Sequence, residues 1–349
     1  MSRNVPFAEV KETIKKALIN AGLSEEQAEI CAEIHAESSA DGVESHGLNR
    51  VPRFVEYVQK GWVDPGAKPE LIRQRGGVEI YDGHLGIGIT NALFAEERAV
   101  ALASEHGIGM CALRNTTHWM RGGTYAWKMA EAGFVGISWI NTESCMPLWG
   151  SDEKSVGNNP FCMAVPRDEG PIVLDMAMSQ YAYGKLGVYR LVGKQLPFPG
   201  GYDRDGNLTS DPGAIEDSMR ILPMGYWKGS GMAIVLDLAA AILSDGRSGS
   251  DMDAEGRGSC TGCSQIFIAM DPGIAESKEE MEAIVNRRIE AADNAHPIKE
   301  GSRVRVPGEG TLARRKRSME EGVTVDETIW AQVQALAEGK MDITDIASR

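Results

Sequence analysis

The sequence predicts an α/β protein. Short apolar runs alternate with longer segments in which apolar residues recur at helical spacing. The common dinucleotide-binding fingerprint, G-x-G-x-x-G between a strand and a helix, is missing, because its nearest match at residues 86–91 lacks the third glycine. If a nicotinamide cofactor binds here, it must therefore bind through another architecture.

Helices are predicted at the N-terminal end of the chain, over residues 6–21, 25–39 and 50–59. Ser24 followed three positions later by Gln27 is typical of a capping box at the start of the second helix. Asp41-Gly42 ends that helix, and Pro52 suits the first turn of the third.

The middle of the chain alternates predicted strands with predicted helices. The strands are apolar runs at 78–81, 107–114, 134–141, 160–166 and 172–177. Helical periodicity is found at 90–105, 122–132 and 179–192. A loop is predicted over 61–69 and a glycine-rich turn over 83–88. This alternation favours the α/β class.

The C-terminal part combines loops, one very apolar helix and a charged helical end. Residues 193–228, rich in Gly, Pro and Asp, predict a long ordered loop, and the most apolar segment, 230–246, predicts a buried helix. Residues 246–263 are small and polar, which predicts a mobile loop. The remaining predicted elements are a strand at 264–271, a short strand or extended segment at 303–308, and helices at 276–293, 309–321 and 326–338.

The two helical ends of the chain are expected to pack together. This predicts a largely helical unit made of residues 1–75 and 290–349, and an α/β unit made of residues 76–289.

Charge and cysteine content narrow the possible functions. The formal net charge of −14 argues against binding nucleic acid or adhering to an anionic membrane. Six cysteines scattered through 349 residues do not form the dense framework of a secreted domain. Neither a signal peptide nor a membrane span is recognised. We therefore expect a cytoplasmic protein without nucleic-acid or membrane partners.

The strongest candidate site lies in residues 41–54, DGVESHGLNRVPRF. His46 precedes Arg50 by four positions, which puts both side chains on one face of a helix or helical turn. Histidine exchanges protons near neutral pH, and arginine can hold a carboxylate through two parallel hydrogen bonds. With Ser45 beside the histidine, this stretch predicts a site that binds an acid and protonates its carbonyl group, although a surface histidine remains the simpler alternative.

Other features have a structural interpretation beside the functional one. His118 follows a predicted strand, where loop residues often carry function, but a buried histidine with satisfied hydrogen bonds fits almost as well. Asp175 interrupts an apolar run, so its carboxylate needs a partner such as a cofactor hydroxyl or backbone amides. Lys228 precedes the apolar helix and could bind a phosphate or lie in solvent. Cys260 and Cys263 lack a second ligand pair, so no metal site is predicted.

The chain resembles the malate/L-lactate dehydrogenase-like oxidoreductases from about residue 6 to residue 338. The resemblance lies in the blocks GVESHGLNRVPRF, GIGMCALRNTTHWMRGG, VGNNPFCMAVP, IVLDMAMS and SQIFIAMD. The segments HWMRGG, RLVGKQLPFPGGYDRDGNLT and RILPMGYWKGSGM are most similar to the 2,3-diketo-L-gulonate reductases within that family. The resemblance implies a nicotinamide-binding fold that is not a Rossmann fold, with a mixed sheet and helices. The helical unit would carry the catalytic residues, and the α/β unit would bind the cofactor.

The resemblance also implies roles for individual residues. His46 matches the family's catalytic histidine, and Arg50 would serve catalysis by holding the substrate carboxylate. Ser45 and His118 would complete the substrate site. The positions that match cofactor contacts are Pro171, Ile172, Val173, Leu174, Asp175, Met176, Ala177, Trp227, Lys228, Gly308, Glu309 and Gly310. At position 158 this chain has Asn where the family commonly has Thr. A homodimer is expected, with the active site near the subunit contact.

The implied activity is hydride transfer from NADH, with NADPH also possible, to the 2-keto group of a sugar acid. The expected reaction converts 2,3-diketo-L-gulonate to 3-dehydro-L-gulonate, with protonated His46 donating to the developing alkoxide and His118 polarising nearby oxygens. Alternatives are dehydrogenation of malate, lactate or ureidoglycolate, and reduction of a cyclic imino acid. A non-redox sugar-acid isomerase or lyase, or a binding protein without catalysis, also remains open.

Overall fold

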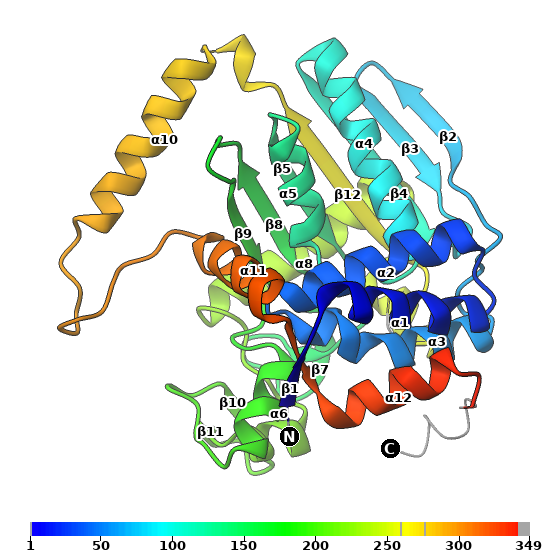
Figure 1. Ribbon diagram of the computed structural model, residues 1–349, viewed down its shortest axis with the longest axis vertical. Helices are drawn as coiled ribbons and strands as arrows, with labels where there is room; N and C mark the ends of the chain where they lie inside the picture. Colours follow the sequence, from blue (N-terminus) through cyan, green and yellow to red (C-terminus); the bar gives the residue numbers. More distant parts are fainter. Residues whose placement is uncertain (1, 259, 276, 341–349) are drawn as a thin grey trace.

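A seven-stranded sheet forms the centre of the molecule (Figure 1). The computed structural model describes residues 2–258, 260–275 and 277–340. In spatial order the strands are β2 (Glu70–Arg75), β3 (Val78–Asp82), β4 (Ile108–Thr116), β12 (Cys263–Met270), β5 (Val135–Ile140), β8 (Phe161–Val165) and β9 (Ile172–Met176). The pair β3–β4 is parallel and the other neighbouring pairs are antiparallel. The predicted α/β class with a mixed sheet is confirmed.

Helices cover both faces of this sheet. One face carries α4 (Gly88–His106) and α5 (Gly123–Glu131), and the other carries α8 (Trp227–Ser244). Successive residues of a strand point to opposite faces. In β4, Cys111 and Leu113 therefore enter the core under α4 and α5, whereas Ala112 enters the core that contains Leu236 of α8. Burial on both faces explains why the central strands are almost uniformly apolar.

The helices from the two ends of the chain share one core, as predicted. They are α1 (Phe7–Asn20), α2 (Glu25–Ala40), α3 (Val51–Gln59) and α12 (Glu327–Ala337), beside a ladder of β1 (Ser2–Val5) with β13 (Val323–Asp326). Ile14 of α1 and Val333 of α12 are fully buried in this core. The predicted capping box is present: the Ser24 hydroxyl accepts from the Gln27 N–H at 3.3 Å, and the Gln27 side chain accepts from the Ser24 N–H at 3.1 Å.

Two segments predicted as loops contain regular structure, so these predictions were partly wrong. Residues 193–228 include β10 (Gly201–Tyr202), β11 (Leu208–Thr209) and α7 (Pro212–Ser218), and α8 begins inside this segment. Residues 246–263 include α9 (Gly249–Glu255), which opens with a capping box formed by Ser248 and Asp251. These elements are too short to show an apolar period, and only their capping residues could have signalled them.

The remaining elements lie outside the central sheet. They are β6 (Met146–Pro147), β7 (Lys154–Val156), α6 (Tyr183–Leu191), α10 (Lys278–Asp293) and α11 (Glu309–Glu321). In Figure 1, α10 stands away from the body and a long connection returns the chain to α11. Residues 303–306 in this connection have no regular structure and 307–308 form a turn, so the predicted segment does not form a strand. The Pro307 carbonyl accepts from the Val173 N–H at 3.3 Å.

The prediction that the apolar helix α8 is buried was wrong for one of its sides. Val235, Leu238 and Ile242 are 62%, 49% and 75% exposed. The helix is apolar on all sides, but only one side packs on the sheet. By length and composition α8 is also the one described helix that could span a membrane, with 33% of it buried. The single chain therefore presents a long apolar surface.

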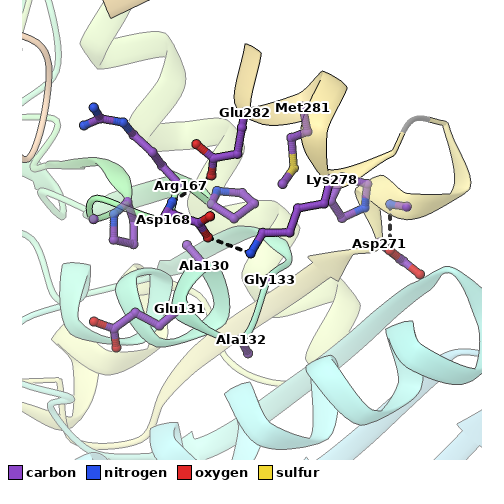
Figure 2. Close-up of a pocket in the computed structure, with 15 residues that line it drawn as sticks. Ala130, Glu131, Ala132, Gly133, Arg167, Asp168, Asp271, Lys278, Met281 and Glu282 are labelled. Atoms are coloured by element: carbon purple, nitrogen blue, oxygen red, sulfur yellow. Dashed lines mark hydrogen bonds and ion pairs between the residues drawn. The ribbon is translucent and has the colours of Figure 1, made fainter. Parts of the chain in front are cut away.

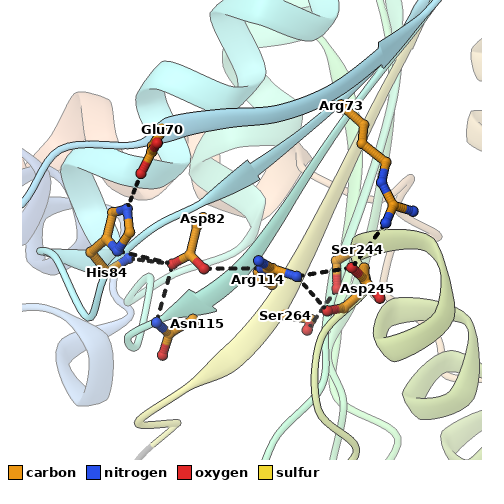
Figure 3. A network of polar contacts seen from close by, with 9 residues as sticks. All are labelled: Glu70, Arg73, Asp82, His84, Arg114, Asn115, Ser244, Asp245 and Ser264. Atoms are coloured by element: carbon orange, nitrogen blue, oxygen red, sulfur yellow. Dashed lines mark hydrogen bonds and ion pairs between the residues drawn. The ribbon is translucent and has the colours of Figure 1, made fainter.

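A polar network joins the end of β4 to the end of α8 (Figure 3). Arg114 of β4 donates to the Asp82 carboxylate at 2.9 Å and to the Asp245 carboxylate at 2.9 Å. Asp245 is the left-handed residue that terminates α8. Because residues 117 and 118 leave β4 just beyond Arg114, the network holds in place the strand end that carries the second predicted histidine.

Candidate active site

The structure brings the predicted histidines and arginine together. His46, Arg50 and His118 line one cavity of about 240 Å³, although His118 lies 68 positions from Arg50 in the chain. Ser45 adjoins them through its hydrogen bond to His46. The cavity lies where α3 meets the loop that follows β4.

His46 and Arg50 lie on two short helical turns rather than on one α-helix. The turns are Glu44–His46 and Leu48–Arg50, and Gly47 separates them. A Cβ atom on Gly47 would lie 2.2 Å from the Ser39 hydroxyl and 2.9 Å from the His35 carbonyl. Only glycine permits this approach to α2. Both side chains still reach the same cavity, as the four-residue spacing predicted.

Buried side chains of α2 support this pair of turns. The Gly47 carbonyl accepts from His35 Nδ1 at 3.0 Å, and the Ser39 hydroxyl accepts from the Leu48 N–H at 2.8 Å. His35 is fully buried, and its Nε2 has no hydrogen-bond partner among the described residues. Burial lowers the pKa of His35 to about 4, so the ring is neutral at physiological pH. Hydrogen bonds with α2 therefore hold the turn that lies between His46 and Arg50.

His118 directs a hydrogen-bond donor towards Arg50. Its Nδ1 accepts from the Met120 N–H at 2.9 Å, so in the neutral ring the proton lies on Nε2. Burial, followed by the charge of Arg50, lowers the pKa of His118 well below its usual value. Nε2 lies 3.4 Å from the Arg50 guanidinium, which can only donate. Two donors therefore meet, and an anionic oxygen would satisfy both.

Arg50 is a cation without an ion-pair partner among the described residues. Its Nε is buried and makes no hydrogen bond within the described part of the chain. Burial, followed by the neighbouring charge of Arg53, lowers the pKa of Arg50. An uncompensated buried charge is costly, and binding a carboxylate would offset that cost.

His46 is oriented by its neighbour in sequence. Its Nδ1 lies 3.0 Å from the Ser45 hydroxyl, which leaves Nε2 for the cavity, and its ring stacks on His118 with centroids 5.7 Å apart. Burial, followed by the charge of Arg50, lowers the pKa of His46 to about 4, while Asp175 opposes this shift. The free protein therefore holds a neutral His46 that an anionic ligand at Arg50 would make more basic.

The rest of this cavity is lined largely by residues that sequence reasoning did not single out. The exceptions include Asn158, in the block that departs from the family pattern, and Cys260, which was considered as a metal ligand. The further lining residues include Tyr57, Thr142, Glu143, Cys145 and Tyr183. Thr142, Glu143 and Cys145 share the loop that follows β5, whereas Tyr57 lies on α3 and Tyr183 on α6, and no spacing in the sequence links these segments.

A second cavity, of about 470 Å³, brings together two of the predicted cofactor segments. Val173, Leu174 and Asp175 of β9 line it together with Gly308, the N-cap residue of α11. Gly308 has a φ of +88°, and a Cβ there would lie 3.0 Å from the Val173 N–H nitrogen. Arg305 also lines the cavity and has no partner among the described residues. A cation with no partner among the described residues, beside the N-terminus of α11, fits the phosphates of a dinucleotide.

Within the protein, Asp175 has side-chain partners instead of the backbone amides that were one of its two expected partners. Its carboxylate accepts from Arg121 at 3.3 Å and from the Cys162 thiol at 3.3 Å, rather than from backbone amides. Arg121 also pairs with the buried Asp41, to which Arg315 donates at 2.7 and 2.8 Å. Arg121 therefore belongs to a structural ion-pair network, and both Arg121 and Asp175 line the second cavity.

The third predicted cofactor segment lies outside both cavities. Trp227 is 65% exposed and Lys228 is also exposed, with its ammonium 6.0 Å from the Trp227 ring centroid. They begin α8, and the Met224 N–H just before them donates to the Met178 carbonyl just after β9. Glu309 makes an ion pair with Arg303 at 2.6 Å.

A third cavity, larger than these two, lies away from the predicted site (Figure 2). It measures about 560 Å³ and lies between the end of α5 and α10. Of the predicted site residues it is lined by Pro171 alone. Its charged groups satisfy one another, since Lys278 pairs with Asp168 at 2.7 Å and the Asp168 N–H donates to Glu282 at 2.7 Å.

Comparisons with known proteins agree on the family. A model of the malate/L-lactate dehydrogenase family matches residues 5–334. The 2,3-diketo-L-gulonate reductase of Citrobacter koseri is 44% identical over 333 residues, which cover 95% of this chain and 99% of that protein.

Solved structures have the same fold. Malate dehydrogenase from Entamoeba histolytica superposes with a TM-score of 0.91 at 22% identity, covering 98% of this chain and 99% of that one. Sulfolactate dehydrogenase from Methanocaldococcus jannaschii superposes with a TM-score of 0.85 at 27% identity, with the same coverage. The chain therefore belongs to the malate/L-lactate dehydrogenase family of oxidoreductases.

Proposed function

We propose that this enzyme reduces the 2-keto group of a sugar acid with NADH, converting 2,3-diketo-L-gulonate to 3-dehydro-L-gulonate. The observation that carries the proposal is the pair of donors formed by Arg50 and His118 beside His46 in one cavity. The 44% identity to a reductase of that name supports the choice of substrate.

The proposed chemistry divides among three side chains. Arg50 holds the substrate carboxylate, and His118 Nε2–H donates to an oxygen next to it. The carboxylate offsets the positive field of Arg50, which raises the pKa of His46 in the complex and lets it take up a proton. His46 then gives this proton to the oxygen of the reacting carbonyl group. In the reverse direction neutral His46 accepts the proton.

The cofactor would lie along the second cavity. A reduced nicotinamide, when bound, supplies the hydride. The backbone of residues 171–177, the turn at 308–310 and Arg305 would hold the phosphates and ribose, and Trp227 with Lys228 would complete the contact. NADH is proposed over NADPH because of the similarity to the reductases, not because of a residue that reads the adenosine ribose.

A second copy of the chain would cover the exposed side of α8. Val235, Leu238 and Ile242 form an apolar stripe that water would otherwise contact, which favours a homodimer. All six cysteines are free thiols, which suits a reducing compartment, and we place the enzyme in the cytoplasm.

The test is a substrate panel. NADH oxidation is followed with 2,3-diketo-L-gulonate beside pyruvate, oxaloacetate and a cyclic imino acid, and is repeated with NADPH. A preference for the diketo sugar acid supports the proposal. Preference for another acid would keep the mechanism and replace the substrate, and an absence of oxidation with every acid would reject the reductase.

A further inference from the structure

We propose that Glu143 makes this site selective for keto acids with an uncharged, hydroxylated tail and against keto acids with a second carboxylate. This inference rests on the proposed reductase function and concerns the part of the substrate that does not react. Glu143 lines the same cavity as His46, Arg50 and His118.

The position of the Glu143 side chain is held by the backbone. Its Oε2 accepts from the Cys260 N–H at 2.7 Å. Cys260 has a φ of +60°. Two positions later, the Gly262 N–H donates to the Thr116 carbonyl at 2.8 Å, at the end of β4. The turn that holds Glu143 is therefore tied to the same strand end as His118, and the carboxylate has a defined place relative to the reacting centre.

The cavity contains a buried cation, Arg50, and an acidic side chain, Glu143, which would act on different parts of the substrate. Arg50 is the cation that meets His118, so it is the group that receives the carboxylate next to the keto carbon. Glu143 is only partly exposed and is the single acidic side chain among the described residues that line this cavity. Arg53, whose charge helps to lower the pKa of Arg50, also lines it, but Arg53 is exposed, so water screens its charge more than that of the partly exposed Glu143. A second carboxylate on the substrate would therefore meet a negative charge in a confined space.

A hydroxylated tail would find partners in the same place. Hydroxyl groups can donate to the Glu143 carboxylate. The Tyr183 hydroxyl donates to the Cys145 carbonyl at 2.8 Å, so its oxygen is free to accept, and the Asn158 amide also lines the cavity. The polar groups beyond the reacting end thus match a chain of alcohols better than a carboxylate or a methyl group.

The test compares wild-type enzyme with Glu143→Gln on three acids. They are 2,3-diketo-L-gulonate, with a neutral hydroxylated tail, oxaloacetate, with a second carboxylate, and pyruvate, with no tail. The amide oxygen of glutamine can still accept from the Cys260 N–H, so this hydrogen bond can persist in the variant. Glu153→Gln, an exposed residue outside the cavity, is the matched control. All measurements use NADH-loaded enzyme.

The expected result is a fall of at least about tenfold in the ratio of kcat/KM for 2,3-diketo-L-gulonate over oxaloacetate, with pyruvate and the control variant little changed. A ratio that stays within about twofold of wild type would overturn the inference. A parallel loss on all three acids would also overturn it, because Glu143 would then act only in structure. If the wild-type enzyme oxidises NADH with none of the acids, the proposed function fails first, and this inference fails with it.

Discussion

The Arg50 guanidinium lies 3.4 Å from His118 Nε2, and the Met120 N–H at Nδ1 makes that nitrogen a donor as well. Two donors this close, one of them a buried cation, form a costly arrangement that an acceptor between or beside them would stabilise. A carboxylate with a neighbouring keto oxygen is such an acceptor. The predictions below follow from this relationship and from the elements that maintain it.

Arg50→Lys should raise KM for the keto acid by about 100-fold while changing NADH affinity little, because lysine keeps the charge but loses the two parallel hydrogen bonds. Steady-state kinetics measure the first quantity, and quenching of protein fluorescence by NADH measures the second. Arg75→Lys on the exposed strand β2 is the control. Equal KM values for Arg50→Lys and wild type would remove Arg50 from carboxylate binding.

His35→Ala should lower kcat by about tenfold or more, since the Gly47 carbonyl would lose its buried donor and the turn between His46 and Arg50 would loosen. His35→Asn, whose amide can donate from a similar position, should recover most of this loss. Ser38→Ala is the matched control, because the Ser38 hydroxyl bonds only within its own helix. If His35→Asn does not recover activity, His35 acts through packing and not through its hydrogen bond to Gly47.

Stability should fall as pH is lowered from about 6.5 to about 4. His35 has an ordinary pKa near 6.5 when unfolded and about 4 in the fold, so the unfolded chain binds the extra proton in this window. The loss is on the order of 3 kcal/mol at the acid end. Urea unfolding at stepped pH measures it, and His35→Asn should show a shallower decline over the same range. Identical slopes for the two proteins would contradict the assignment.

Ile242→Asp should convert a dimer to a monomer, because a charge would enter the apolar stripe of α8 that a second copy is proposed to cover. Light scattering after size exclusion reports the mass. Ile274→Asp, at an equally exposed residue 72% open to solvent in the turn before α10, is the control. A variant that keeps the wild-type dimer mass would place the contact elsewhere, and a monomeric wild type would reject the homodimer.

The sequence predicted the elements with strong periodicity and the residues of the first cavity that carry recognisable chemistry. The strands of the central sheet that it identified have long apolar runs because they are buried on both faces. It missed β2, whose residues are mostly exposed and polar, and it could not order the strands, since β12 enters between β4 and β5 from far along the chain. Strand order depends on tertiary pairing rather than on local pattern.

In the candidate site, too, the sequence predicted local relationships but not contacts between distant segments. The spacing of His46 and Arg50 predicted their common direction, because that relationship is local. Glu143, Tyr183 and Cys260 carry no such signal, since they reach the cavity from three separate segments. The exposed side of α8 was missed for a related reason. An apolar helix is predicted as buried, but the sequence does not say whether its own chain or a second copy covers it.

The measurement that tests the central claim most directly compares NADH oxidation by wild-type enzyme and by His46→Asn, with 2,3-diketo-L-gulonate as substrate. NADH affinity is determined on both proteins by fluorescence. We predict that turnover falls by about a thousandfold or more while NADH affinity stays within about threefold, because His46 moves the proton but does not hold the cofactor. Near-normal turnover by His46→Asn would contradict the account, since the proton would then come from another group.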